Sequence, residues 1–256
     1  MSVSIDTVYQ RVLGILNKEQ RGYVTPQEFN LFANQAQMDL FEQYFYDINQ
    51  FSRMSGNSSE YSDMLTILNE KINLFETTSP NLPYIDAANP TQGFSLPSDL
   101  YRLGSVIYAN VTSEPILPSP QDPNNPLVTT DYIEVERINA NEFLLINSSP
   151  LTKPKNVRPI YVGNQSGIKV YGDSQIIDSV TVNYIRKPVK VEWKYQMVYG
   201  EALYDATYSV DFELHPSEET ELVIKILELA GLLVKDIQMY QIAAGEEVRN
   251  TQEEKA

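Results

Sequence analysis

The sequence nearly lacks the side chains that most often carry chemistry in proteins. Its 256 residues include no cysteine, one tryptophan and a single histidine, His215, which precedes a proline. The absence of cysteine excludes disulfides and thiolate metal sites, and it fits synthesis in a reducing cytoplasm. No calcium-loop spacing, glycine-rich phosphate loop or nucleophile elbow is present. We therefore expect no enzyme, no metal and no cofactor, and we interpret His215 as part of a turn before a helix.

Basic residues are also scarce. The chain holds 19 Lys and Arg against 34 Asp and Glu, a formal net charge of −15. The acidic surplus is terminal, with 5 basic and 10 acidic residues in 1–76, 10 and 11 in 77–195, and 4 and 13 in 196–256. Tight binding to DNA or anionic lipid depends mainly on Lys and Arg. The charge therefore disfavours both partners, although DNA could still slide past an acidic surface.

Membrane and export signals are missing as well. The first residues show no basic stretch followed by an apolar run, and the apolar runs are shorter than a membrane span. We expect a protein made in the cytoplasm that does not associate with membranes.

Three helical patterns open the chain, at 4–19, 26–51 and 59–76. Thr25, Pro26 and Glu28 give the second helix a capping hydroxyl, a proline at its first position and a carboxylate three residues after the cap. This helix is apolar over a broad face. Such a face is either buried in the subunit or presented to a partner. Its candidate assembly contacts are Phe29, Phe41, Tyr44 and Phe45.

The middle of the chain changes character, because prolines recur from 80 to 126 and forbid long helices. Strand-like runs at 101–109, 132–137, 159–162, 168–171 and 179–186 predict a small antiparallel sheet or barrel of about five strands. A long exposed excursion is expected at 114–131, and one helical turn at 141–147. The loop that holds Lys153, Lys155 and Arg158 is either a basic contact with DNA or an acidic partner, or a strand edge guarded against aggregation.

A last helix is predicted from Pro216 to Ala244, followed by a polar tail. Its candidate assembly contacts are Leu233, Ile237, Tyr240, Glu246 and Glu247. We interpret the acidic runs 218–221 and 246–247 as solvated helix ends. The expected fold class is α+β, with an amino-terminal helical region (1–76), a β-rich domain (77–195), and a long carboxyl-terminal helix with an acidic tail (196–256) that packs with the amino-terminal helices.

Several segments, in this order, resemble head-to-tail connector proteins of short-tailed bacteriophages, in particular the ring or adaptor proteins of crAss-like phages. They are TVYQRVLGILNKEQRGYVTPQEFNLFANQAQMDLFEQYF (7–45), LPSDLYRLGSVIY (96–108), EVERINANEFLLINSSPLTKPKNVRPIYV (134–162), VTVNYIRKPVKVEW (180–193) and VDFELHPSEETELVIKILELAGLLVKD (210–236). The resemblance implies a structural protein of the virion neck that forms a ring of copies of itself, commonly twelve. Its implied partners are the portal protein and other connector or tail proteins, with DNA passing through the ring without specific binding.

Two other functions remain open from the residues. One is a tail component that binds or cleaves glycans, because a glycosidase needs only two carboxylates. The single tryptophan, Trp193, offers such a site little stacking surface. The other is a scaffold domain of a host cell with no relation to phage.

Overall fold

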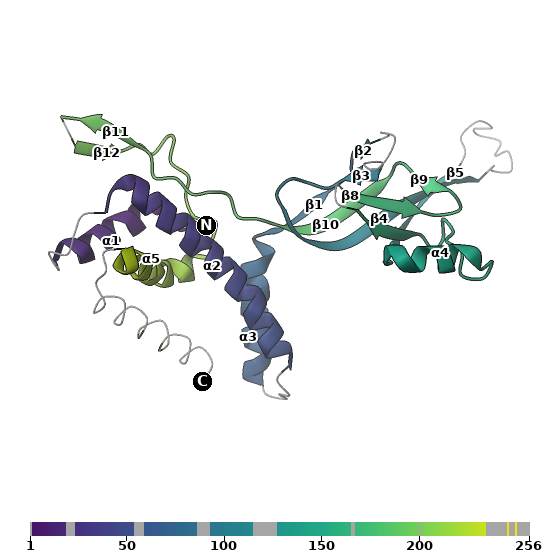
Figure 1. Ribbon diagram of the computed structural model, residues 1–256, viewed down its shortest axis with the longest axis horizontal. Coiled ribbons are helices and arrows are strands. Elements are labelled where there is room, and N and C mark those ends of the chain that lie inside the picture. The colour runs from purple at the N-terminus through teal and green to yellow at the C-terminus, as the bar shows by residue number, and fades with distance from the viewer. Residues whose placement is uncertain are drawn as a thin grey trace. The chain divides into compact units, whose positions relative to one another are not determined.

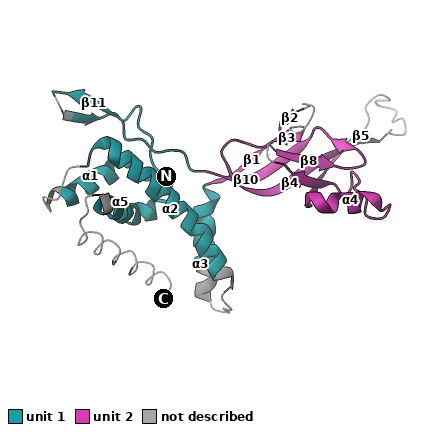
Figure 2. Ribbon diagram, in the orientation of Figure 1, with its two compact units in different colours: residues 1–74, 188–256 teal, residues 75–187 magenta. Residues whose placement is uncertain are grey.

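The computed structural model describes residues 2–18, 24–53, 59–85, 93–114, 127–164, 167–199, 201–233, 245 and 249. It confirms the α+β class, with helices near both ends of the chain and antiparallel and mixed sheets. Residues 1–74 and 188–256 form one compact unit, called unit 1, and residues 75–187 form unit 2 (Figure 2). The predicted boundaries were 76/77 and 195/196. They differ because Glu76 already begins a strand of unit 2, whereas 189–193 hydrogen-bonds to a helix of unit 1.

Unit 1 is built from helices and one hairpin (Figure 1). Its helices are α1 (Ile5–Lys18), α2 (Pro26–Arg53), α3 (Ser59–Asn73) and α5 (Glu219–Leu233), and its hairpin joins β11 (Tyr195–Val198) to β12 (Glu201–Tyr204). Helix α5 packs against α1 and α2, and α3 packs against α2. Their shared core is fully buried and includes Ile5, Val12, Phe29, Phe41, Leu222 and Ile226.

The starts of the helices follow from capping. The backbone N–H of Glu28 donates to Thr25 Oγ1 at 3.3 Å, and the N–H of Thr25 donates to Glu28 Oε2 at 2.9 Å. These bonds satisfy amides that have no partner within the helix, which confirms the predicted start of α2. The bond from the Thr25 N–H, together with one that the Thr25 hydroxyl donates to Glu28 Oε2 at 2.8 Å, lowers the pKa of Glu28, because both bonds stabilise its carboxylate. Helix α1 is capped from a distant segment, since the N–H of Ile5 donates to Asp211 Oδ1 at 2.9 Å.

The last helix begins with the short 3₁₀ turn η1 (Pro216–Glu218), where His215 Nδ1 accepts from the N–H of Ser217. This confirms the interpretation of His215 as a turn residue. The prediction that 218–221 is a solvated helix end is wrong for Glu218. Its side chain is 3% exposed and its Oε1 lies 2.6 Å from Lys71 Nζ. The end predicted at Ala244 lies outside the described residues.

The described residues of unit 2 form two sheets. The first has the order β1 (Glu76–Ser79), β10 (Val180–Arg186), β4 (Leu100–Glu114) and β5 (Leu127–Glu134), all antiparallel. The second has the order β2 (Tyr84–Ile85), β3 (Gly93–Ser95), β8 (Gly167–Tyr171), β7 (Ile160–Gly163) and β6 (Glu136–Arg137), with β9 (Gln175–Ile176) beside β8. Because β6 and β7 run parallel, the second sheet is mixed.

One core joins the two sheets of unit 2. It includes Val106, Val180 and Val182 from the first sheet and Phe94, Ile168 and Val170 from the second. Along β10, Val180, Val182 and Tyr184 are buried and alternate with partly exposed residues, as their spacing predicts. The estimate of about five strands was too low, because β1, β2, β3, β6 and β9 have only two to four residues each. Strands that short show too little alternation to be recognised.

Two other expectations for unit 2 need adjustment. The excursion predicted for 114–131 is wrong at 127–131, where β5 pairs with β4, and 115–126 lie outside the described residues. The predicted helical turn at 141–147 is the longer helix α4 (Ala140–Ser148). No helix among the described residues has both the length and the apolar character needed to cross a bilayer.

Candidate functional site

The features of unit 1 that could serve assembly begin with a row of amides on α2. Asn30, Asn34 and Gln37 face the extended segment 189–193 and hydrogen-bond to its backbone. Asn34 Nδ2 donates to the carbonyl of Val191 at 2.8 Å, and the N–H of Val191 donates to Asn34 Oδ1 at 3.0 Å. Asn30 makes the same pair of bonds with Trp193, at 3.2 and 2.8 Å. Gln37 Nε2 donates to the carbonyl of Val189 at 2.8 Å.

The spacing of this amide row matches the spacing of the backbone groups in 189–193. The amides are spaced four and then three residues along the helix, a rise of about 6 Å and about 4.5 Å, and two extended residues span about 6.6 Å. The steps are close enough for successive amides to meet every second residue of the segment. The side chains therefore replace a neighbouring strand for backbone groups that would otherwise be unsatisfied. This role was not predicted from the sequence. The signal was present, because amides at positions 30, 34 and 37 share one helix face with buried Ala33 and Phe41.

The amide row holds the base of the β11–β12 hairpin. Trp193 is 2% exposed, and the rings of Tyr195 and Tyr204 both stack on it with centroids 5.7 Å away. Its Nε1 donates to Asp6 Oδ1 at 3.0 Å, and Tyr9 packs on it at 4.3 Å. Trp193 is thus a core residue that anchors the hairpin, and it is not available at the surface as a sugar-stacking ring.

Asp205 closes the same base. It accepts hydrogen bonds from Gln196 Nε2 at 2.6 Å and from the N–H of Thr207 at 3.0 Å. These bonds lower the pKa of Asp205, the one from Gln196 most strongly, because each favours the carboxylate over the acid. The base of the hairpin is therefore fixed by both stacking and hydrogen bonds.

The tip of the hairpin is apolar and open to solvent. We call Met197, Val198, Tyr199 and Leu203 the hairpin tip; their exposed fractions are 65%, 41%, 104% and 62%. The strands pair only with each other in the described residues, and the hairpin projects from the helices of unit 1 (Figure 1). Tyr199 has a φ of 52°, a left-handed conformation that is rare for a bulky residue. An isolated two-stranded hairpin is at best marginally stable in water.

An apolar groove lies elsewhere on unit 1, between α1 and α5. It has a volume of about 460 Å³, and Ile15, Val223, Ile224 and Leu227 line it together with Gly14 and Arg11. At its margin Arg11 pairs with Glu219 at 3.1 Å. A Cβ atom added at Gly14 would meet no atom within 4 Å outside the neighbouring backbone of its own helix.

Three of the four assembly contacts predicted on α2, Phe29, Phe41 and Tyr44, belong to the core instead. Phe29 and Phe41 are fully buried and Tyr44 is 4% exposed, while Phe45 is half-buried and packs edge-on against Phe41 at 5.1 Å. Phe29 meets Tyr9 at 4.7 Å. The broad apolar face of α2 is thus covered within the subunit. The contacts predicted near the carboxyl end fall outside the description: the side chain of Leu233 and all of Ile237, Tyr240, Glu246 and Glu247.

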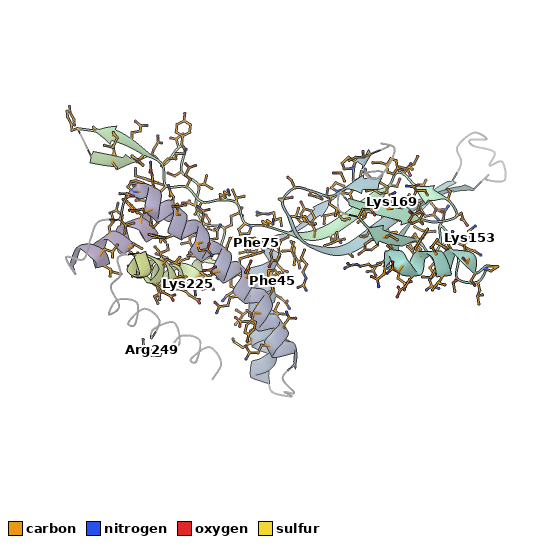
Figure 3. All side chains as sticks on the ribbon, in the orientation of Figure 1. Phe45, Phe75, Lys153, Lys169, Lys225 and Arg249 are labelled. Atoms are coloured by element: carbon orange, nitrogen blue, oxygen red, sulfur yellow. The ribbon has the colours of Figure 1, made fainter. Side chains whose placement is uncertain are left out.

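In unit 2, Lys153, Lys155 and Arg158 lie in the loop between α4 and β7, and all three are exposed. Figure 3 labels Lys153 near α4. Lys155 and Arg158 pair through their backbones at 2.9 and 3.3 Å, and Arg158 also forms an ion pair with Glu136 at 3.1 Å. Exposed Leu144, Leu145 and Leu151 lie nearby in sequence. The loop is a surface with both basic and apolar residues.

A second cavity, of about 410 Å³, lies in unit 2, where Glu134, Glu136, Arg137 and Tyr161 line it. Burial raises the pKa of Tyr161, and Arg137 partly opposes the shift. Both glutamates are exposed. No group of three or more His, Asp or Glu residues in the described parts of the chain could hold a metal ion.

No protein-family model matches this chain, and no curated protein matches its sequence.

Proposed function

We propose that this protein is a structural subunit of a phage connector, which forms a ring between portal and tail and lets DNA pass. The observation that carries the proposal is the hairpin tip, a projecting apolar surface on a firmly anchored base. Monomeric proteins seldom expose contiguous apolar patches larger than a few hundred Å², and such patches commonly mark protein interfaces. The proposal that the partners are copies of this chain and other neck proteins comes from the resemblance to ring proteins. Five segments carry that resemblance: 7–45, 96–108, 134–162, 180–193 and 210–236.

The charge distribution supports passage of DNA. The net charge of −15 would repel the phosphate backbone and leave few cations to release counterions on binding. An inner ring surface of this kind would guide the genome without retaining it. The basic loop of Lys153, Lys155 and Arg158 would then contact acidic partner proteins of the neck.

The test is the oligomeric state of the purified full-length chain. We expect closed rings, twelve subunits in each, by mass photometry and by class averages in electron microscopy. Mixing with purified portal protein should yield a stacked complex. A chain that stays monomeric at tens of micromolar, with or without portal, would contradict the proposal.

One observation favours a second candidate, a glycan-binding tail component. The unit 2 cavity brings two carboxylates, a guanidinium and a phenol to one place, which are groups that hydrogen-bond to sugar hydroxyls. A glycan array and a hydrolysis assay of the intact protein decide it. Glycan binding or hydrolysis that is lost in Glu134→Gln would support this candidate. Absence of binding to every glycan on the array, together with absence of hydrolysis, would exclude it.

A further inference from the structure

The hairpin tip combines two features that are unfavourable in an isolated subunit. Tyr199 is fully exposed and adopts a φ of 52°, where glycine or asparagine would fit without strain. Two-residue hairpin turns with a positive φ at their first residue favour Asn-Gly or Asp-Gly, yet in this sequence a tyrosine precedes Gly200. Strained residues of this kind cluster where a ligand or partner is held. Burial of the Tyr199 side chain in a partner would offset this strain.

The apolar side chains occupy both faces of the hairpin. Cross-strand pairing puts Met197 opposite Ala202 on the face that carries Tyr195 and Tyr204, and puts Leu203 with Val198 on the other face. A tip that carries apolar side chains on both faces is covered best by a receptor that surrounds it. A flat surface would cover only one face.

The α1–α5 groove has the matching character. Aliphatic side chains make up most of its lining, and its volume of about 460 Å³ accommodates several large side chains. Gly14 keeps one side of it open, because no side chain projects there. Both the hairpin and the groove belong to unit 1, so one compact unit carries a projection and a receptor.

We propose that the hairpin tip of one subunit inserts into the α1–α5 groove of the next copy of this chain, an inference that rests on the proposed ring. The two surfaces differ, so the interface is heterologous. Repeated contacts of this kind close into a ring when the rotation between neighbours divides a full turn. Each subunit then gives one tip and receives another.

The size of the tip shows how such a ring would behave. Its four side chains offer roughly 400–500 Å² of surface, against about 800 Å² per partner in a standard stable interface. A single pair is therefore weak. Ring closure stabilises the assembly, because every subunit makes two contacts and the last contact is intramolecular. We expect few dimers and a sharp concentration threshold for rings.

Cross-linking tests the pairing directly, since the chain has no cysteine of its own. Tyr199→Cys and Gly14→Cys variants are mixed and treated with a short bismaleimide, and each is also treated alone. The proposal predicts covalent dimers in the mixture, none in either variant alone, and a ladder of oligomers from the double variant. Three results would overturn it: self-linking of Tyr199→Cys, a purely intramolecular link in the double variant, or no link within preparations that form rings. Absence of any oligomer would instead count against the proposed function itself.

Paired variants separate assembly from folding. Tyr199→Asn removes the aromatic side chain and relieves the backbone strain. Thermal stability should therefore hold or rise, while the protein concentration needed to form oligomeric rings increases about tenfold or more. Tyr208→Ser removes another exposed tyrosine outside the tip and should leave assembly unchanged. Gly14→Trp fills the groove and should block rings, whereas Gly14→Ala should not. The proposal would be contradicted if either Tyr199→Asn or Gly14→Trp formed rings at the same protein concentration as the unaltered chain.

Discussion

Replacement of Asn34 by alanine gives the sharpest test of how unit 1 holds its hairpin. The change removes two hydrogen bonds to Val191, of 2.8 and 3.0 Å. Each bond contributes about 1 kcal/mol, and a buried backbone group without a partner costs about 1–3 kcal/mol. Val191 is 2% exposed, so water does not readily replace the lost amide. We expect Asn34→Ala to lower the free energy of unfolding of unit 1 by about 2–4 kcal/mol.

Urea denaturation and amide hydrogen exchange measure this effect. Exchange should accelerate at Val191 and Trp193, whose N–H groups the amide row protects. The control is Gln35→Ala on the same helix, where the exposed Gln35 side chain bonds to Asp39 at 2.7 Å and the loss should be about 0.2–0.5 kcal/mol. If Asn34→Ala costs no more than Gln35→Ala, the amide row does not hold the segment and the reasoning fails.

Three further predictions concern stability. Lys71→Met should lower the free energy of unfolding, measured in urea, by about 3 kcal/mol, because it leaves the buried carboxylate of Glu218 without its cation. Adding Glu218→Gln to that variant should recover much of the loss. An unchanged urea midpoint in Lys71→Met would refute this prediction. Thr25→Ala should lower stability by about 1 kcal/mol, measured by thermal unfolding, through loss of the α2 cap. Thr7→Ala, which changes an exposed threonine of α1, serves as the control. The lowered pKa of Asp205 means that its carboxylate stabilises the hairpin base above about pH 3.9. That contribution should vanish as the pH falls through the lower folded pKa, seen as faster exchange of the Thr207 amide, and Asp205→Asn should remove the pH dependence.

The helices could be predicted because their signals are local. Thr25, Pro26 and Glu28 define the start of α2 within four residues, and the apolar spacing of α1 and α5 repeats over several turns. The alternation along β10 is equally local. The hairpin β11–β12 was missed, because Tyr199-Gly200 departs from the usual turn residues and its exposed faces show no polar alternation.

The candidate site depended on contacts that sequence patterns do not contain. The spacing of Phe29 and Phe41 indicates an apolar face, but the pattern does not tell which segment covers it. The cover includes Tyr9, which touches Phe29 and also packs on Trp193, a residue far along the chain. Glu218 likewise has the spacing of a solvated helix start and becomes a buried partner only because Lys71 at the end of α3 reaches it. Burial of these groups is a property of the tertiary structure.

The central claim is that copies of this chain meet head to tail through the hairpin tip and the α1–α5 groove. Electron cryo-microscopy of the purified protein tests it most directly. The account predicts closed rings in which density for Tyr199 of each subunit lies against Gly14 and Leu227 of its neighbour. Single subunits at tens of micromolar, or rings whose hairpins point freely into solvent, would contradict it.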